Sequence, residues 1–87
     1  MENKTYSVEF KPKAIKELNK ISKPNVIRIL NKIEALEKGL TGDIKQLTNY
    51  SPEYRLRVGN YRVLFEVEGQ KIIIYHIKHR KEAYFGR

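Results

Sequence analysis

Apolar and cationic side chains alternate along residues 54–67, YRLRVGNYRVLFEV, on both sides of a Gly59-Asn60 pair. Two alternating runs separated by such a pair are typical of a β-hairpin with a two-residue turn. That turn places Arg57 directly opposite Arg62 on one face of the sheet, where like charges destabilise the pairing. The pattern therefore predicts a hairpin in which another group must offset the repulsion between Arg57 and Arg62.

The register of this hairpin separates its apolar side chains from its arginines. On one face it pairs only apolar or aromatic residues, namely Val58 with Tyr61, Leu56 with Val63, and Tyr54 with Phe65. Arg55, Arg57 and Arg62 point the other way, and a slip of one residue would bury them, so the pairing is well specified. We expect the apolar face to pack against helices.

Three strands are expected in this half of the chain, over about residues 53–58, 61–68 and 71–78. If Gly69-Gln70 is also a two-residue turn, then Ile73, Tyr75 and Ile77 join the arginine face. His76 then lies on the core face, where we interpret it as a structural residue. The last strand, IIIYHI, is apolar on both sides, which is typical of a central strand or of one half covered by another chain.

The first half of the chain changes from a strand period to a helical one. Thr5–Phe10 alternates as a short strand, and from Pro12 the apolar residues recur at helical spacing, with an interruption at Ser22-Lys23-Pro24. The two helical stripes consist of Ala14, Ile15, Leu18 and Ile21, and of Val26, Ile29, Leu30, Ile33 and Leu36. Gly39 is a natural end for the second helix. The turn-rich stretch that follows includes a segment, Ile44–Leu47, whose pattern assigns it to no element.

The order of these elements predicts one α+β domain that spans residues 1–87. It would consist of an N-terminal strand, an antiparallel helical hairpin, and a three-stranded antiparallel meander, all built on a single, mainly antiparallel sheet.

Eighteen Lys and Arg residues stand against ten Asp and Glu, which gives a formal net charge of +8. So basic a small protein favours polyanionic partners, either nucleic acid or an acidic protein, although such charge also serves plain solubility. The chain has no cysteine, which excludes disulfides, a thiolate nucleophile and a cysteine zinc site. No apolar run approaches the roughly 20 residues that cross a bilayer, so we expect a cytoplasmic protein without membrane contact.

Arg55, Arg57 and Arg62 form the first candidate site. Within this cross-strand cluster the sequence shows no carboxylate before Glu66, and an anion bound between the guanidinium groups would turn repulsion into attraction. The favoured interpretation is therefore a phosphate-binding site. The alternative is a set of solvated surface arginines, screened by salt.

The stretch HRKEAY, residues 79–84, is the second candidate because it can fold back toward the arginine face. His79 is the side chain there that suits proton transfer near neutral pH, and Tyr84 could stack on an unpaired RNA base. An ordinary tail, with Tyr84 plugging the edge of the core, is the alternative. No phosphate-binding glycine loop, Ser-His-Asp order or metal-ligand spacing occurs, so any RNA cleavage is expected to proceed without a metal, by attack of the ribose 2′-hydroxyl.

The run YRLRVGNYRVLFEV, followed by an apolar strand and HRKEAY, resembles the RelE side of the RelE/ParE family of toxin–antitoxin toxins. The order of strands and helices matches as well, over nearly the whole chain. The resemblance implies a ribosome-dependent endonuclease that cuts mRNA in the ribosomal A site. It also implies that Arg55, Arg57, Arg62, Arg80 and Tyr84 carry activity.

Some members of this family have lysines where this chain has Arg55 and Arg57. Because arginine is a fixed cation and cannot easily act as a base, the identity of the base stays open, and the case for His79 becomes stronger. Lys78 and Lys81, beside His79, are assigned with Arg55 to substrate binding. No metal or small-molecule cofactor is expected.

The expected partners are the ribosome with its mRNA, and a cognate RelB-like antitoxin whose acidic segment covers apolar and basic surface. A second class of function stays open at this point, in which the protein binds without catalysis. It would then be either a ParE-like toxin directed at DNA gyrase or an RNA-binding module.

Overall fold

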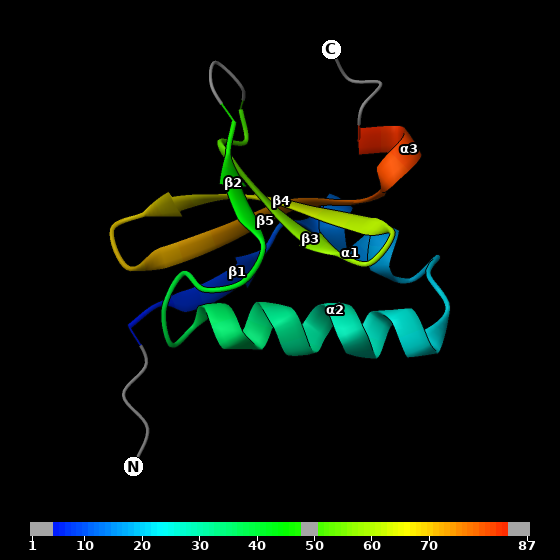
Figure 1. Ribbon diagram of the computed structural model, residues 1–87, viewed down its shortest axis with the longest axis horizontal. Coiled ribbons are helices and arrows are strands. Elements are labelled where there is room, and N and C mark those ends of the chain that lie inside the picture. The colour runs from blue at the N-terminus through cyan, green and yellow to red at the C-terminus, as the bar shows by residue number, and fades with distance from the viewer. Residues whose placement is uncertain (1–4, 48–50, 84–87) are drawn as a thin grey trace.

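The computed structural model describes residues 5–47 and 51–83, which form one five-stranded sheet with its helices (Figure 1). In chain order the elements are β1 (Ser7–Phe10), α1 (Pro12–Leu18), α2 (Lys23–Leu36), β2 (Ile44–Gln46), β3 (Tyr54–Val58), β4 (Tyr61–Glu68), β5 (Lys71–His79) and α3 (Arg80–Ala83). The sheet order is β1-β5-β4-β3-β2, with every pairing antiparallel except that of β1 with β5. The predicted α+β class and order of elements are confirmed. No helix in the described ranges is long and apolar enough to span a membrane.

The strand β5 is central, as its apolar sequence predicts. It pairs in parallel with β1 and antiparallel with β4. Ile72 and Ile74 are fully buried in the main core, and Ile73 is buried on the opposite side of the strand. A strand with a neighbour on each edge and cover on both faces needs apolar residues at consecutive positions.

The core lies between the sheet and α2, which runs along one of its faces (Figure 1). Its buried members are Ala14, Ile29, Ile33, Leu36, Leu56, Val58, Val63, Phe65, Ile72, Ile74 and Ile77. The helical stripes are narrower than predicted, because Ile15 and Leu30 are 47% and 40% exposed. On α2 the inward residues Ile29, Ile33 and Leu36 leave Leu30, one position further round the helix, at the edge of the contact.

The segment that the sequence left unassigned forms the edge strand β2, which pairs with β3. Ile44 lies opposite Leu56 and packs against the core. The residue before the strand, Asp43, is held beside β3 because its carbonyl accepts the Arg57 N–H at 2.9 Å. This edge strand therefore brings a carboxylate next to the arginines, which the pattern of 54–67 alone did not indicate.

The register between β3 and β4 is the predicted one, with Arg57 opposite Arg62. Between β4 and β5 it shifts: Phe65 pairs with Ile74, but Leu64 pairs with His76, so Tyr75 is an extra residue that forms a β-bulge. The bulge moves every later residue of β5 to the face opposite the predicted one.

Two predicted positions on β5 are consequently wrong. Ile77 was expected on the arginine face, but it lies opposite Val63 and is buried in the core. His76 was expected on the core face, but it lies opposite Leu64, on the side of the arginines. Ile73, which precedes the bulge, lies opposite Glu66 as predicted.

Candidate functional site

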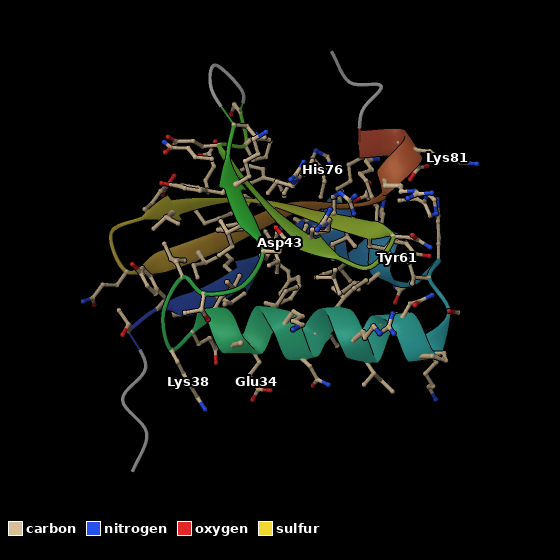
Figure 2. The ribbon with its side chains drawn as sticks, viewed as in Figure 1. Glu34, Lys38, Asp43, Tyr61, His76 and Lys81 are labelled. Atoms are coloured by element: carbon tan, nitrogen blue, oxygen red, sulfur yellow. The ribbon has the colours of Figure 1, made fainter. Side chains whose placement is uncertain are left out.

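Three cations from three neighbouring strands form one row across the sheet. Arg57 of β3 pairs with Arg62 of β4, which pairs in turn with Lys78 of β5. Arg55 and His76 occupy the next row on the same side. We call the surface formed by Arg55, Arg57, Arg62, His76 and Lys78 the cationic face. Figure 2 shows that its labelled member, His76, lies on the side of the sheet away from α2.

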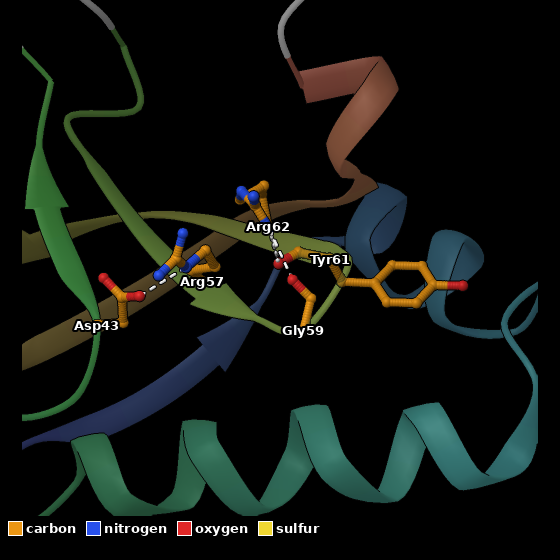
Figure 3. A network of polar contacts seen from close by, with 5 residues as sticks. All are labelled: Asp43, Arg57, Gly59, Tyr61 and Arg62. Atoms are coloured by element: carbon orange, nitrogen blue, oxygen red, sulfur yellow. Dashed lines mark hydrogen bonds and ion pairs between the residues drawn. The ribbon is translucent and has the colours of Figure 1, made fainter.

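Arg57, at one end of the row, has an acidic neighbour. Its Nε lies 2.6 Å from Oδ2 of Asp43, and both side chains are about half exposed, at 54% and 49% (Figure 3). The expectation that the cluster holds no carboxylate before Glu66 is therefore wrong, because β2 brings Asp43 to it. Exposed ion pairs of this kind stabilise proteins by only about 0.2–1 kcal/mol, so another anion can compete for the arginine.

Arg62, in the middle of the row, is only 5% exposed and has no carboxylate partner among the described residues. One terminal nitrogen donates hydrogen bonds of 3.0 Å to the carbonyls of Gly59 and Tyr61, which closes the β3–β4 turn (Figure 3). Asp43 on one side and these carbonyls on the other offset the repulsion between Arg57 and Arg62. Within the described ranges, Nε of Arg62 is a buried donor without a hydrogen-bond partner.

Glu17 of α1 sits at the other end of the row, where β5 extends beyond the end of β1. Its Oε1 accepts the backbone N–H of Ile77 at 2.8 Å, and its Oε2 lies 2.6 Å from Nζ of Lys78. Burial raises the pKa of the Glu17 carboxyl, but the hydrogen bonds from Lys78 and Ile77 and the charge of Lys78 outweigh this and hold that pKa below its usual 4.5. The Glu17 carboxylate thus accepts the backbone hydrogen bond that a neighbouring strand would otherwise accept from Ile77, and it holds Lys78 in place.

His76 lies beside the same carboxylate. Its Nδ1 is 3.6 Å from Oε1 of Glu17, and its side chain is 29% exposed. That nitrogen is buried without a hydrogen-bond partner in the part of the chain that the structure describes. The bulge at Tyr75 therefore places an imidazole on the cationic face, one row from Arg62.

His79 lies opposite Tyr61. It is therefore on the same side of the sheet as the core residues, whereas Arg62 and Lys78 are on the other side. Its ring Nδ1 accepts a hydrogen bond from the backbone N–H of Lys81 at 3.3 Å. The backbone N–H of His79 donates to the Glu82 carboxylate at 3.2 Å. Its ring meets the Tyr61 ring edge-on, at a centroid distance of 5.5 Å. These contacts hold His79 at the start of α3, beside a pocket of about 280 Å³ between α1, β5 and α3.

The remaining predicted residues are spread around the cationic face. Arg55 is partly exposed, and its Nε is another buried donor without a partner among the described atoms. Arg80 and Lys81 are exposed on α3, which lies on the side of the sheet away from α2 (Figure 1). The N–H of Arg80 donates to the Asn60 carbonyl at 2.7 Å and so ties α3 to the β3–β4 turn. Tyr84 lies outside the described residues.

Sequence reasoning missed the two carboxylates and the imidazole that border this row. Asp43 and Glu17 come from β2 and α1, far from the arginines in sequence, and no local pattern links them. His76 was assigned to the wrong face because strict alternation does not reveal a bulge. No group of three or more His, Asp or Glu side chains in residues 5–47 and 51–83 converges as a metal site requires.

Comparison with known proteins gives a consistent family. A family model described as ParE toxin of type II toxin-antitoxin system, parDE, matches residues 8–84. Toxin RelE3 of Methanocaldococcus jannaschii is 50% identical over 42 residues, and the match spans 48% of this chain and 48% of that protein. The matched segment is thus about half the length of that curated relative.

Solved structures extend the likeness to most of the chain. The RelB-RelE antitoxin-toxin complex from Methanococcus jannaschii contains a chain with a TM-score of 0.73 and 35% identity, over 86% of this chain and 93% of that one. The archaeal RelE-RelB complex from Pyrococcus horikoshii OT3 gives a TM-score of 0.75 and 28% identity, over 87% and 96%. The chain therefore belongs to the RelE/ParE superfamily of type II toxin–antitoxin toxins, as a RelE-like member.

Proposed function

We propose that this toxin is an mRNA endonuclease that acts on the translating ribosome, and that the cationic face receives the ribose-phosphate backbone. The observation that carries the proposal is the row Arg57–Arg62–Lys78, whose central member is buried and lacks a carboxylate partner. A phosphate bound at the neighbouring, exposed Arg57 would lie close to the positive charge of Arg62 and be attracted by it.

The carboxylates at the ends of the row do not prevent phosphate binding. Asp43 forms an exposed pair with Arg57, which a phosphate can replace with two parallel hydrogen bonds from the same guanidinium group. Glu17 is more buried than Asp43 and also accepts a hydrogen bond from the Ile77 N–H. Its ion pair therefore keeps Lys78 in place. The site therefore has one exchangeable cation, one held cation and Arg62 between them.

In the proposed reaction, the 2′-oxygen of a ribose forms a bond to the adjacent phosphorus while the bond from phosphorus to the next 5′-oxygen breaks. The 2′-hydroxyl loses its proton to a base, and the 5′-oxygen gains one. The products are a 2′,3′-cyclic phosphate and a 5′-hydroxyl. Fixed guanidinium groups stabilise the charge that develops on the phosphate oxygens, without a metal in the proposed mechanism.

The other residues expected from the sequence and from the family resemblance remain part of this proposal. Arg80 and Tyr84 are assigned to the reaction, and Arg55 and Lys81 to binding of the RNA. The exposed positions of Arg80 and Lys81 on α3 are compatible with these assignments. A site made mostly of cations needs its substrate held in position, which supports dependence on the ribosome.

We also propose an antitoxin partner, encoded next to the toxin and acidic in the segment that binds it. The archaeal relatives were solved as complexes of RelE with RelB, and the net charge of +8 would attract such a segment. Co-expression with the neighbouring reading frame should give a complex that co-purifies. Separate elution of the two proteins at low salt would contradict this part of the proposal.

A non-catalytic toxin directed at DNA gyrase is the second candidate, because the matching family model is that of the ParE toxin. Primer extension on a translated message, before and after induction of the toxin, separates the two. We expect discrete breaks within codons for the wild type and their loss in Arg57→Gln. The matched control Lys32→Gln removes the same charge from α2 and should leave the breaks unchanged. An intact message in the wild type would instead favour the gyrase-directed candidate.

A further inference from the structure

His76 is the one imidazole that the described chain presents on the cationic face. It projects from β5 in the row next to Arg62 and Lys78, and residues diagonal to each other across two strands lie about 7–8 Å apart. A phosphate held by Arg62 would therefore bring its own ribose within reach of the His76 ring. His79, in contrast, lies on the core side of the sheet, and its Nδ1 accepts a hydrogen bond from the Lys81 N–H.

Glu17 lies beside one side of the His76 ring. Its carboxylate is anchored by the Ile77 N–H at 2.8 Å and by Lys78 at 2.6 Å, and it is only 14% exposed, so its position is well determined. From that position it faces Nδ1 of His76 at 3.6 Å. A carboxylate beside Nδ1 favours the tautomer with the proton on that nitrogen, which leaves the lone pair on Nε2.

The other charged groups on the same face are Lys78 of β5, Arg62 and Glu66 of β4, and Arg55 of β3. The neighbouring Tyr75 has Lys11 5.6 Å from the centre of its ring. Glu66 accepts a hydrogen bond from Ser51 at 2.9 Å. Among the described residues, Glu17 is therefore the carboxylate that approaches His76, at 3.6 Å.

We propose that His76 is the general base of the endonuclease reaction and that Glu17 is its positioning residue, an inference that rests on the proposed function. Nε2 of His76 takes the proton from the ribose 2′-hydroxyl as the 2′-oxygen bonds to phosphorus. The bond from phosphorus to the 5′-oxygen breaks, and that oxygen receives a proton from water. His76 returns its proton to solvent after the product leaves.

The test is single-turnover cleavage of mRNA on programmed ribosomes, measured from about pH 5.5 to about pH 8.5, the range in which imidazoles titrate. For the wild type the rate should rise with pH as the base loses its proton. His76→Gln should lower the rate by about 10²-fold or more and remove this rise. Added imidazole should partly restore cleavage by His76→Ala, which also shows that the variant is folded.

Glu17→Gln separates positioning from chemistry. It should slow cleavage by about tenfold or more because the ring is no longer held, but the rise with pH should persist because the imidazole is still present. Glu34→Gln is the matched control, since Glu34 lies on the outer side of α2 (Figure 2), and it should cleave like the wild type.

Two results would overturn the inference while leaving the proposed function intact. In one, His76→Gln cleaves at the wild-type rate with the same pH profile. In the other, the loss of rate and of the pH dependence follows substitution of the candidate base that the sequence favours, His79→Gln. No cleavage by the wild type under these conditions would instead contradict the proposed function itself.

Discussion

Two arginines face each other across a hairpin because each has its own compensating contact. Arg57 has Asp43 at 2.6 Å, and Arg62 has the carbonyls of Gly59 and Tyr61 at 3.0 Å. The two contacts differ in what they permit. A carboxylate on an exposed arginine can be exchanged for another anion, whereas carbonyls that close a turn keep Arg62 in place whether or not a ligand is bound.

Asp43→Asn tests this difference at the level of one residue. The substitution removes the competing negative charge, so single-stranded RNA should bind roughly 1.4- to fivefold more tightly, which corresponds to the 0.2–1 kcal/mol of an exposed pair. Fluorescence anisotropy at low and at high salt measures the effect, which should shrink as salt rises. Glu34→Gln, which changes the same charge on α2, should show a smaller gain. Equal gains in both variants would mean that net charge alone sets the affinity.

Glu17 gives a prediction about stability and pH. Because the folded-state pKa of its carboxyl lies below the usual 4.5, the contact with Lys78 and Ile77 stabilises the fold above that pH and is lost as pH falls through the lowered value. Glu17→Gln should therefore lower the free energy of unfolding at neutral pH by about 1–3 kcal/mol. Urea denaturation should show the difference from wild type shrinking as the pH falls below 4.5. A difference that does not change with pH would contradict this account of the carboxylate.

At the level of elements, the bulge in β5 decides which side chains reach the cationic face. Tyr75 is the extra residue, so Ile77 enters the core and His76 with Lys78 joins the arginines. If Tyr75 were paired as a regular strand residue, the last part of the strand would present the opposite residues to each side. The bulge therefore determines the composition of the site.

Deletion of Tyr75 should remove the bulge and leave Ile77 opposite Val63 in the core, because every later pair keeps its partner. We expect the deletion to cost less than the roughly 2–5 kcal/mol that the loss of a buried isoleucine costs. Tyr75→Ala is the control, because it keeps the bulge and loses only a partly exposed ring with its Lys11 contact. Thermal unfolding followed by circular dichroism compares the two. A loss as large as that of a buried isoleucine would contradict the assignment of Tyr75 as the extra residue of β5.

The sequence was enough to predict the β3–β4 hairpin but only part of the site, for a physical reason. An error of one residue in β3 or β4 would bury arginines and expose Leu56 and Val63, so the sequence specifies that register strongly. β5 is apolar on both sides, and alternation then gives no warning of a bulge. The contacts of Asp43 and Glu17 depend on how β2 and α1 pack against the sheet, which local periodicity does not determine.

At the scale of the whole molecule, the charge of +8 is spread over both sides, while the proposed chemistry belongs to one. Lysines on α2, such as Lys23 and Lys32, are exposed on the element that covers the opposite face of the sheet. General attraction to RNA would involve both sides equally. If the nuclease site lies on the cationic face, removing two charges from that face should slow cleavage much more than removing two charges from α2.

The most direct measurement is therefore the single-turnover rate of mRNA cleavage on ribosomes by two double variants with the same net charge. Arg57→Gln with Arg62→Gln changes the cationic face, and Lys23→Gln with Lys32→Gln changes α2. With both variants folded by circular dichroism, we predict that the first loses about 10²-fold or more of the rate and that the second stays within a few-fold of wild type. Equal losses in the two variants, or full activity in the first, would contradict the assignment of the cationic face as the site of cleavage.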